Sequence, residues 1–302
     1  MSENLPPTID PVAAAHWQHI APAQSPWLHE EVGRRMEARL QWILRTPRTW
    51  CDWQAVRGGL QTHDAIAQRY PQAQCYVVEA EPRMQTKAQE NFAKPWWTPS
   101  RWASAKTLVQ KPVPGSVDML WANMLLHNAA QPERMLQDWH AVLALDGFVM
   151  FSCLGPDTVK EIRALYERLG WPAAGHSLTD MHDWGDMLVH AGFAEPVMDM
   201  ETITLTFGTP ERLLQELREL GRNLHPQRFA GLRGRAWHAE LLQGLSDHLR
   251  VDSSDGQLAL TFEVVYGHAF KPEPRLTVQS QSTVSLEQMR RMLKKPSEQG
   301  LR

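Results

Sequence analysis

Apolar residues along the chain follow two periods, one typical of buried strands and one typical of amphipathic helices. Short apolar or alternating runs predict strands at residues 49–53, 75–78, 106–109, 117–122, 148–152, 197–207 and 258–270. Apolar residues at helical spacing predict helices at residues 26–44, 60–69, 82–92, 132–143, 158–169, 178–191, 211–220 and 237–249. Because strands alternate with helices, the pattern predicts an α/β fold with a Rossmann-like, doubly wound, mostly parallel seven-stranded sheet.

The same pattern predicts one domain, over residues 26–270, with flanking segments of a different character. Residues 1–25 are rich in Pro and Ala and predict a loose arm, and the polar tail 271–302 is expected to be mobile. Ser25 is expected to cap the first helix, with Pro26 at its first position. Residues 208–257, between the last two strands, predict a helical lid over the C-terminal edge of the sheet, where open α/β folds bind ligands.

Composition is that of an ordinary globular protein. The chain has 302 residues, of which 43% are hydrophobic and 22% charged, which is enough for a sizeable core. A net charge of −3 argues against a general nucleic-acid binder. No basic segment precedes an apolar run at the N-terminus, and no apolar stretch approaches the roughly 20 residues of a membrane span. We therefore expect a cytoplasmic protein with neither nucleic acid nor membrane as a partner.

Residue types that bind metals are present but do not predict a metal site. Cys51, Cys75 and Cys153 are too few and too scattered for a disulfide framework or a zinc site, and are expected to be buried thiols in a reducing compartment. His176, His182 and Asp183 are of residue types that commonly bind metals, yet we expect no metal there.

The stretch from Asp52 to Glu81 has the layout of a nucleotide-binding βαβ unit. A strand ends at Asp52, a turn containing Gly58 follows, and a helix then leads to a second strand that is followed by Glu79. In such a unit the first turn holds a cofactor and the acid after the second strand binds a ribose. The alternative for Asp52 is a cap of the following turn, and for Glu79 a solvated strand end.

From Val117 onward the chain carries motifs that resemble a known family. VDMLWANMLLHNAAQPERMLQDWHAVLALDGFVMFSCLGPDTVKEIR, LTDMHDWGDMLVHAGFAEPVMDME and FEVVYGHAF are similar to segments of class I S-adenosylmethionine-dependent methyltransferases. Within that superfamily they look most like the malonyl-carrier-protein methyltransferases of biotin synthesis, the BioC family. The resemblance runs from about Pro26 to Pro272. It implies methyl transfer from S-adenosylmethionine to the free carboxylate of a malonyl group on acyl-carrier protein.

Carried over by position, the resemblance assigns cofactor binding to Asp52, Gly58, Glu79 and Asn123. Asp52 opens the cofactor motif, and Gly58 is the one remaining motif glycine. Glu79 would bond the ribose hydroxyls, with Glu81 as a second candidate. Asn123 and His127 match positions near the methyl donor. The alternatives are a turn residue for Asn123 and a packed helix-start histidine for His127.

The resemblance is incomplete at the cofactor motif. Gln54 and Val56 occupy the positions of the other two glycines, which let the backbone approach the methionine part of the cofactor, so their side chains are expected to obstruct it. Ala105 and Lys106 stand where the family often has an Asp that contacts the adenine amine, and Lys has no acceptor for that contact. A second function is therefore also predicted: a non-catalytic relative with weakened or lost cofactor binding, acting as a binding or regulatory protein.

The proposed chemistry needs alignment of the reactants more than acid or base catalysis. A free carboxylate is already ionised at neutral pH, so methylation requires proximity and the exclusion of water. A cationic clamp, ideally an Arg, would hold the substrate carboxylate. Residues 222–239 contain four arginines and no acid, namely Arg222, Arg228, Arg233 and Arg235. They are candidates for the clamp and for a surface that binds acidic acyl-carrier protein, with a solvated face as the alternative.

Overall fold

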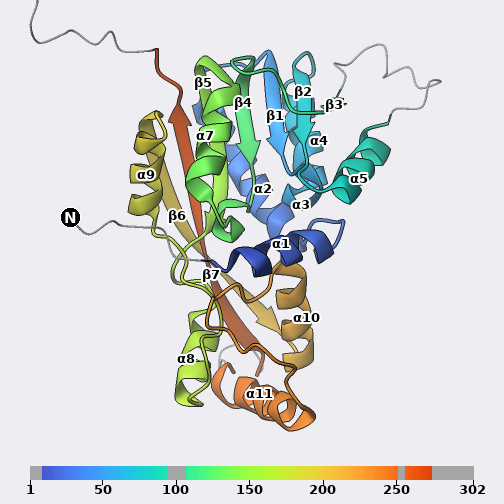
Figure 1. Ribbon diagram of the computed structural model, residues 1–302, viewed down its shortest axis with the longest axis vertical. Helices are drawn as coiled ribbons and strands as arrows, with labels where there is room; N and C mark the ends of the chain where they lie inside the picture. Colours follow the sequence, from blue (N-terminus) through green and yellow to red (C-terminus); the bar gives the residue numbers. More distant parts are fainter. Residues whose placement is uncertain (1–8, 94–106, 251–255, 274–302) are drawn as a thin grey trace, which may run out of the picture. The chain divides into compact units, whose positions relative to one another are not determined.

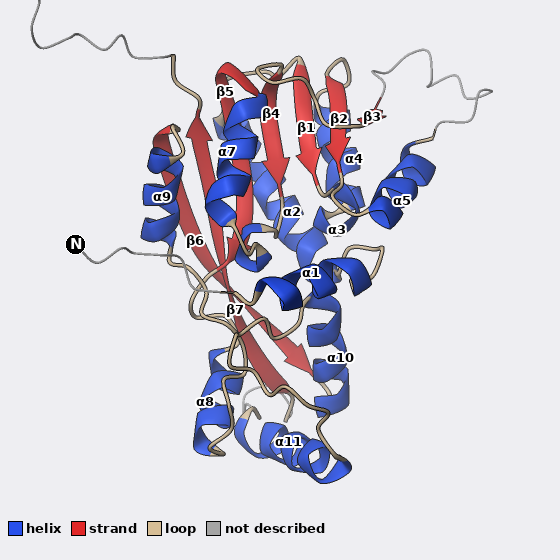
Figure 2. Ribbon diagram, in the orientation of Figure 1, coloured by secondary structure: helices blue, strands red, loops and turns tan. Residues whose placement is uncertain are grey.

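A seven-stranded sheet forms the centre of the computed structural model, which describes residues 9–93, 107–250 and 256–273 (Figures 1 and 2). The strand order is β3-β2-β1-β4-β5-β7-β6. β7 pairs antiparallel with both β5 and β6, and all the other pairs are parallel. The strands are β1 (Thr49–Trp53), β2 (Gln74–Val78), β3 (Thr107–Val109), β4 (Val117–Ala122), β5 (Leu143–Leu154), β6 (Ala194–Phe207) and β7 (Leu258–Phe270). The predicted mostly parallel, Rossmann-like sheet is confirmed.

Apart from α1 and α3, which were not predicted, the helices lie close to their predicted positions. They are α1 (Pro11–Ile20), α2 (Trp27–Arg39), α3 (Ala55–Gly58), α4 (Leu60–Arg69), α5 (Pro82–Phe92), α7 (Pro132–Val142), α8 (Lys160–Arg168), α9 (Met181–His190), α10 (Pro210–Leu220) and α11 (Arg235–His248), with short 3₁₀ turns at Leu40–Trp42 and Leu126–Asn128. None of the helices in the described ranges is long and apolar enough to cross a membrane.

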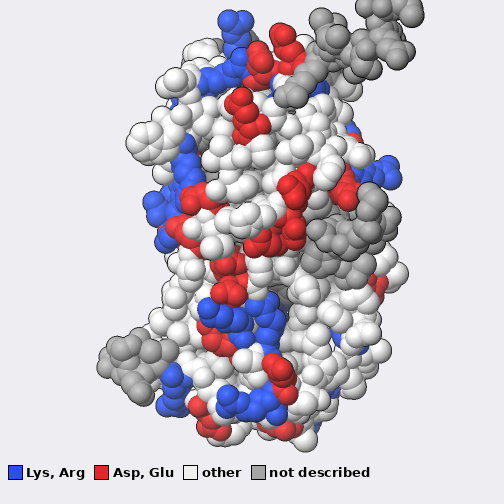
Figure 3. All heavy atoms as spheres, turned by 90° about the vertical axis from the view of Figure 1, so that its left-hand side faces the viewer, with Lys and Arg blue, Asp and Glu red and all other residues white. Residues whose placement is uncertain are grey.

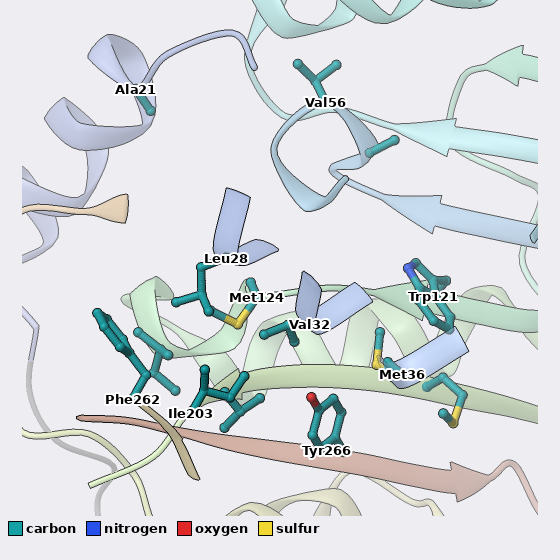
Figure 4. Packing of buried hydrophobic residues seen from close by; sticks show 14 of the residues in the cluster. Ala21, Leu28, Val32, Met36, Val56, Trp121, Met124, Ile203, Phe262 and Tyr266 are labelled. Carbon is teal, nitrogen blue, oxygen red and sulfur yellow. The ribbon is translucent and has the colours of Figure 1, made fainter. Parts of the chain in front are cut away.

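Both faces of the sheet are buried, as expected for parallel strands covered by helices. Alternate residues of β4 point to opposite faces. Met119 and Trp121 join the cluster that α2 covers, whereas Leu120 and Ala122 join the cluster that α7 and α9 cover. Figure 4 shows part of the first cluster, in which Val32 of α2 lies over the sheet. The cysteines at residues 51, 75 and 153 are buried free thiols in these strands, as predicted.

The N-terminal segment differs from the loose arm that its weak pattern predicts. Residues 11–20 form α1, and the side chain of Asp10 caps it by accepting hydrogen bonds from the backbone N–H groups of Val12 at 2.9 Å and Ala13 at 3.3 Å. Only Ala14 and Trp17 of this helix are buried, so the segment has too few apolar positions to show a period. The prediction is wrong for α1.

The start of α2 also differs from the prediction. The helix begins at Trp27, and Pro26 in an extended conformation takes the capping position without a side-chain hydrogen bond. The hydroxyl of Ser25 instead bonds the carboxylate of Glu30. The predicted Ser25 cap is therefore wrong, because the extended Pro26 already separates Ser25 from the first turn.

The segment between β6 and β7 lies next to a part of the sheet that extends past the parallel strands. β5 pairs with β7 from Phe148 to Leu154, and Leu154 lies opposite Val264. β7 begins at Leu258, so its first residues pair with β6 and not with β5, and extend past the C-terminal end of β5. Helices α8, α10 and α11 lie around this extension (Figure 2). The predicted limits of the domain and of the lid stay predictions, and Trp96, Trp97, Trp102 and the tail after residue 273 lie outside the described residues.

Candidate functional site

A hollow lies at the C-terminal ends of β1, β2 and β4. It is lined by residues of α1, of the turn after β1 and of the loops after β2 and β4, among them Trp17, Gln54, Glu79 and Asn123. Its volume of about 60 Å³ is small beside the roughly 300–1,000 Å³ of typical ligand sites. The hollow is where the sequence places a cofactor, but in this conformation it is narrow.

The turn after β1 keeps a glycine-like backbone although two of the expected glycines are absent. Gln54 has a φ of 65°, in the left-handed region that glycine adopts readily and other residues adopt at a cost of about 1–2 kcal/mol. Its side chain lines the hollow. Val56, in contrast, is fully buried in the hydrophobic core and does not line the hollow (Figure 4). Of the two side chains expected to obstruct the cofactor, only that of Gln54 therefore lines the hollow, and the obstruction itself stays a prediction.

Glu79 follows β2, and its side chain contacts the turn after β1. Its Oε1 accepts a hydrogen bond of 2.9 Å from the backbone N–H of Val56. Burial raises the pKa of Glu79 to about 8, against the lowering effect of this hydrogen bond, and the charge of Asp52 raises it further. Within the described residues no group bonds Oε2, so that oxygen remains available to a hydroxyl group in the hollow. The alternative of a solvated strand end does not hold, because Glu79 is only 6% exposed.

Asp52 lies beneath the hollow and does not line it. Its Oδ2 is 2.8 Å from Nδ1 of His63 on α4, and both side chains are buried. Burial raises the pKa of Asp52, and the hydrogen bond from His63 opposes that rise. The ring of His63 packs between those of Trp50 and Phe92, at centroid distances of 4.9 and 4.3 Å. Asp52 thus fixes α4 to β1. The sequence reading missed His63, because its contact with Asp52 is tertiary and leaves no local period.

Asn123 connects the end of β4 to the turn and to α2. Its Nδ2 donates to the carbonyl oxygens of Gly58 and of His29, the latter at 2.7 Å, and its Oδ1 accepts a 2.6 Å hydrogen bond from Ser152. A Cβ added at Gly58 would lie 3.6 Å from the carbonyl oxygen of Asn123, which is ordinary contact. Asn123 lines the hollow, but protein groups already occupy its amide.

Arg57 connects the turn to the end of α10. Its side chain lines the hollow, and its guanidinium donates to the carbonyl oxygens of Gln24 at 3.0 Å, Glu219 at 2.8 Å and Leu220 at 3.4 Å. The last two carbonyls end α10. Burial lowers the pKa of Arg57 to about 10, so the side chain stays cationic at neutral pH. The sequence reading missed it, because nothing in the local pattern points to these distant partners.

A second, larger pocket adjoins the hollow. Its volume is about 320 Å³, its walls include Leu154, Ile162 and Leu214, and it shares His29 and Asn128 with the hollow. The pocket therefore lies between α8, α10 and the loop after β4, next to the site where a cofactor is expected.

The structure separates the four candidate arginines. Only Arg222 lines the pocket, and its guanidinium lies 5.0 Å from the ring centroid of Trp17. Arg228 forms an ion pair with Asp10, and Arg233 stacks on three aromatic rings, the nearest being Phe229 at 4.0 Å. Arg235 is the first residue of α11. Arg163 and Arg218, which were not predicted, also line the pocket.

Three buried or half-buried histidines, His29, His127 and His176, line the same pocket. Burial lowers the pKa of each, that of His29 to about 3, so the rings are neutral at pH 7. His182 instead bonds Asp180 at the start of α9. The described residues contain no group of three or more side chains that could hold a metal ion.

Comparison with known proteins gives consistent results. Residues 57–151 match the family described as a methyltransferase domain. The malonyl-[acyl-carrier protein] O-methyltransferase of Laribacter hongkongensis is 37% identical over 256 residues, which cover 82% of this chain and 84% of that protein. The enzyme of the same description from Gallionella capsiferriformans is 38% identical over 258 residues, covering 82% and 86%.

A solved structure supports the fold independently. The YcgJ protein from Bacillus subtilis aligns with a TM-score of 0.50 at 12% identity, over 82% of this chain and all of that one. At this identity the likeness concerns the fold alone. The family resemblance seen in the sequence is confirmed by the two relatives that are more than 30% identical.

Proposed function

The chain belongs to the family of malonyl-[acyl-carrier protein] O-methyltransferases, and on that basis we propose that it methylates the free carboxylate of a malonyl thioester on acyl-carrier protein, in biotin synthesis. The methyl donor is S-adenosylmethionine. The observation that carries the proposal is the pair of adjoining cavities at the C-terminal edge of the sheet, which share His29 and Asn128. A reaction between two bound molecules needs such neighbouring sites, because most of the rate gain comes from holding the reactants together.

The donor set around the hollow fits S-adenosylmethionine. Glu79 has a carboxyl oxygen available for a ribose hydroxyl, and the turn keeps the left-handed backbone at Gln54. When bound, this cofactor supplies an electrophilic methyl group. The hollow of about 60 Å³ must widen to admit it, and Gln54, Arg57 and Trp17 are the side chains that line it and would move.

The substrate site follows from the larger pocket. The carboxylate is ionised at neutral pH, so no side chain has to remove a proton. Because the histidines of the pocket are neutral, the arginines that line it are its cations at neutral pH. Arg222 lines the pocket next to Trp17, which lines the hollow, so we assign the carboxylate clamp to Arg222. The remaining basic residues of 222–239 would face the acidic carrier protein.

The test is a transfer assay with malonyl-acyl-carrier protein and labelled S-adenosylmethionine, followed by intact-protein mass spectrometry. The expected product carries one added methyl group, and unmodified acyl-carrier protein without the malonyl group carries none. Growth of a biotin-requiring strain that lacks the methyltransferase, restored by this chain, is the second expected result. Absence of methylation at saturating donor contradicts the proposal.

A second candidate function is a non-catalytic relative that acts as a binding or regulatory protein. The observation that favours it is the narrow hollow, with Gln54 and Arg57 lining it at positions of the cofactor turn. This candidate predicts that the chain binds malonyl-acyl-carrier protein but neither S-adenosylmethionine nor S-adenosylhomocysteine. Titration with each ligand therefore separates the two functions.

A further inference from the structure

Two of the ionisable groups that line the hollow, Glu79 and Arg57, do not pair with each other. Glu79 bonds the backbone of the turn, and Arg57 bonds backbone carbonyl groups outside it. Both side chains line the same space. A ligand with hydroxyl donors and a separate anionic group would therefore find a partner for each.

Among the described residues Arg57 forms no direct ion pair, and the charge of Glu219 raises the pKa of Arg57 less than burial lowers it. Elsewhere arginines do pair with carboxylates, as Arg39 does with Asp199 at 2.7 Å. In the described part of the chain, the three hydrogen-bond acceptors of the Arg57 guanidinium are neutral carbonyl oxygens, and they are reached through Nη1 and Nη2. The Nε–H group thus has no partner in the described part of the chain. A largely buried cation without a direct ion pair is costly, and an anionic ligand group would offset that cost.

One backbone donor of the turn is already occupied by a protein group. Gln54 and Val56 stand where motif glycines would let the backbone approach the methionine part of the cofactor. The N–H group of Val56 already donates to Glu79 at 2.9 Å, so it is not free for a ligand carboxylate. Arg57 is the cationic residue of the same turn, and its side chain, which lines the hollow, is a further donor for that end of the cofactor.

We propose that Arg57 binds the α-carboxylate of the methionine part of S-adenosylmethionine, in place of the backbone contacts of a glycine-rich turn. The inference rests on the proposed function, and it assigns a ligand contact to a residue outside the family motif. A guanidinium can bind a carboxylate through two parallel hydrogen bonds, which gives both affinity and orientation. Since the same guanidinium bonds the end of α10, binding of the carboxylate competes with its contacts to Glu219 and Leu220.

The test compares two ligands on the full chain by calorimetric titration. S-adenosylhomocysteine carries the amino-acid part, and 5′-methylthioadenosine has the same adenosine and thioether but lacks it. We expect the wild-type protein to bind S-adenosylhomocysteine about tenfold or more tightly than 5′-methylthioadenosine. Arg57→Ala should remove that preference and leave the affinity for 5′-methylthioadenosine unchanged.

Two further variants make the result specific. Arg83 does not line the hollow, although its positive charge lowers the pKa of Arg57. The variant Arg83→Ala should therefore keep the preference for S-adenosylhomocysteine over 5′-methylthioadenosine. Arg57→Gln serves if the alanine variant does not fold, and should show the same loss. An unchanged preference in the Arg57 variants overturns the inference while leaving the cofactor site intact. Failure of the wild-type protein to bind either ligand overturns both the inference and the proposed function.

Discussion

The carboxyl group of Glu79 accepts a hydrogen bond of 2.9 Å from the backbone N–H of Val56. This contact joins the end of β2 to the turn after β1, the two places that hold the ribose and the methionine part of a cofactor in the family. It occupies one oxygen of Glu79 and leaves the other to a ligand. The carboxyl group of Glu79 is also buried, and its burial makes the stability of the protein depend on pH.

Stability should depend on pH through Glu79. Its pKa is raised from 4.5 to about 8, so the folded protein holds this proton more tightly than the unfolded chain does. The stabilisation is fully present below the ordinary pKa and is lost as pH rises through about 8. Glu79→Gln keeps an oxygen for the Val56 N–H and removes the titration. Between about pH 5 and about pH 9 the wild type should lose free energy of unfolding relative to this variant, on the order of a few kcal/mol.

Urea denaturation of the two proteins at several pH values measures this difference. Other titrating groups are shared by both proteins, so they cancel in the comparison. Parallel curves for wild type and Glu79→Gln across the whole range would show that Glu79 is ionised in the folded protein at neutral pH.

Replacement of Gln54 by glycine should widen the hollow without harm to the fold. The left-handed φ of 65° costs Gln about 1–2 kcal/mol and costs glycine nothing, while glycine loses about 0.5–1 kcal/mol through the flexibility of the unfolded chain. The net change in stability should be a gain of up to about 1 kcal/mol, with tighter binding of S-adenosylhomocysteine. Thermal unfolding and titration measure the two effects.

The matched control is Val56→Ala in the same turn. Its fully buried side chain leaves a cavity, so we expect a loss of about 2 kcal/mol and no gain in affinity. A gain in affinity from Val56→Ala but not from Gln54→Gly would mean that the wrong side chain has been identified as the obstruction.

Asp52 should affect stability more than ligand binding. It is buried beside His63, and removal of one partner of a buried pair costs about 3–5 kcal/mol. Asp52→Ala should show a loss of that order by urea denaturation, whereas Asp52→Asn, which still accepts from His63, should lose less. The folded fraction of Asp52→Asn should bind S-adenosylhomocysteine with nearly wild-type affinity. Lost binding in an otherwise stable Asp52→Asn protein would place Asp52 in contact with the ligand.

Arg222 should matter for the substrate and not for the cofactor. Because Arg222 lines the larger pocket and not the hollow, Arg222→Gln is expected to raise the KM for malonyl-acyl-carrier protein about tenfold or more. The affinity for S-adenosylhomocysteine should stay the same. Arg235→Gln, at the start of α11 and outside the pocket, is the control for general charge. Equal effects of the two substitutions would indicate a diffuse basic surface in place of a clamp.

The sequence predicts the positions of the helices and strands well, because Pro and Gly residues mark the ends of the apolar runs. The bounds of β1, β4, β7, α4 and α5 coincide with the predicted ranges. The start of β5 does not: Leu145 to Gly147 resembles a turn, yet the strand begins at Leu143. Asp146 adopts a φ of 58° there and the pairing with β4 shifts register, so local turn chemistry occurs inside a strand.

The candidate site is predictable only in part. Glu79 and Asn123 line the hollow as expected, because the end of a parallel strand always opens at the same edge of the sheet. The partners of Asp52 and Arg57 could not be foreseen, since His63 and Glu219 meet them through tertiary contacts that leave no local period. Lys106, which bears on adenine recognition, lies outside the described residues.

Calorimetric titration of the purified protein with S-adenosylhomocysteine tests the central claim, that the altered turn still binds the cofactor. The account predicts saturable heat with one site per chain, a rise in the thermal unfolding temperature, and loss of both in Glu79→Ala. The absence of both heat and a thermal shift at millimolar ligand would contradict this claim and would leave the non-catalytic function. Binding that is unchanged in Glu79→Ala would show that the cofactor is held elsewhere.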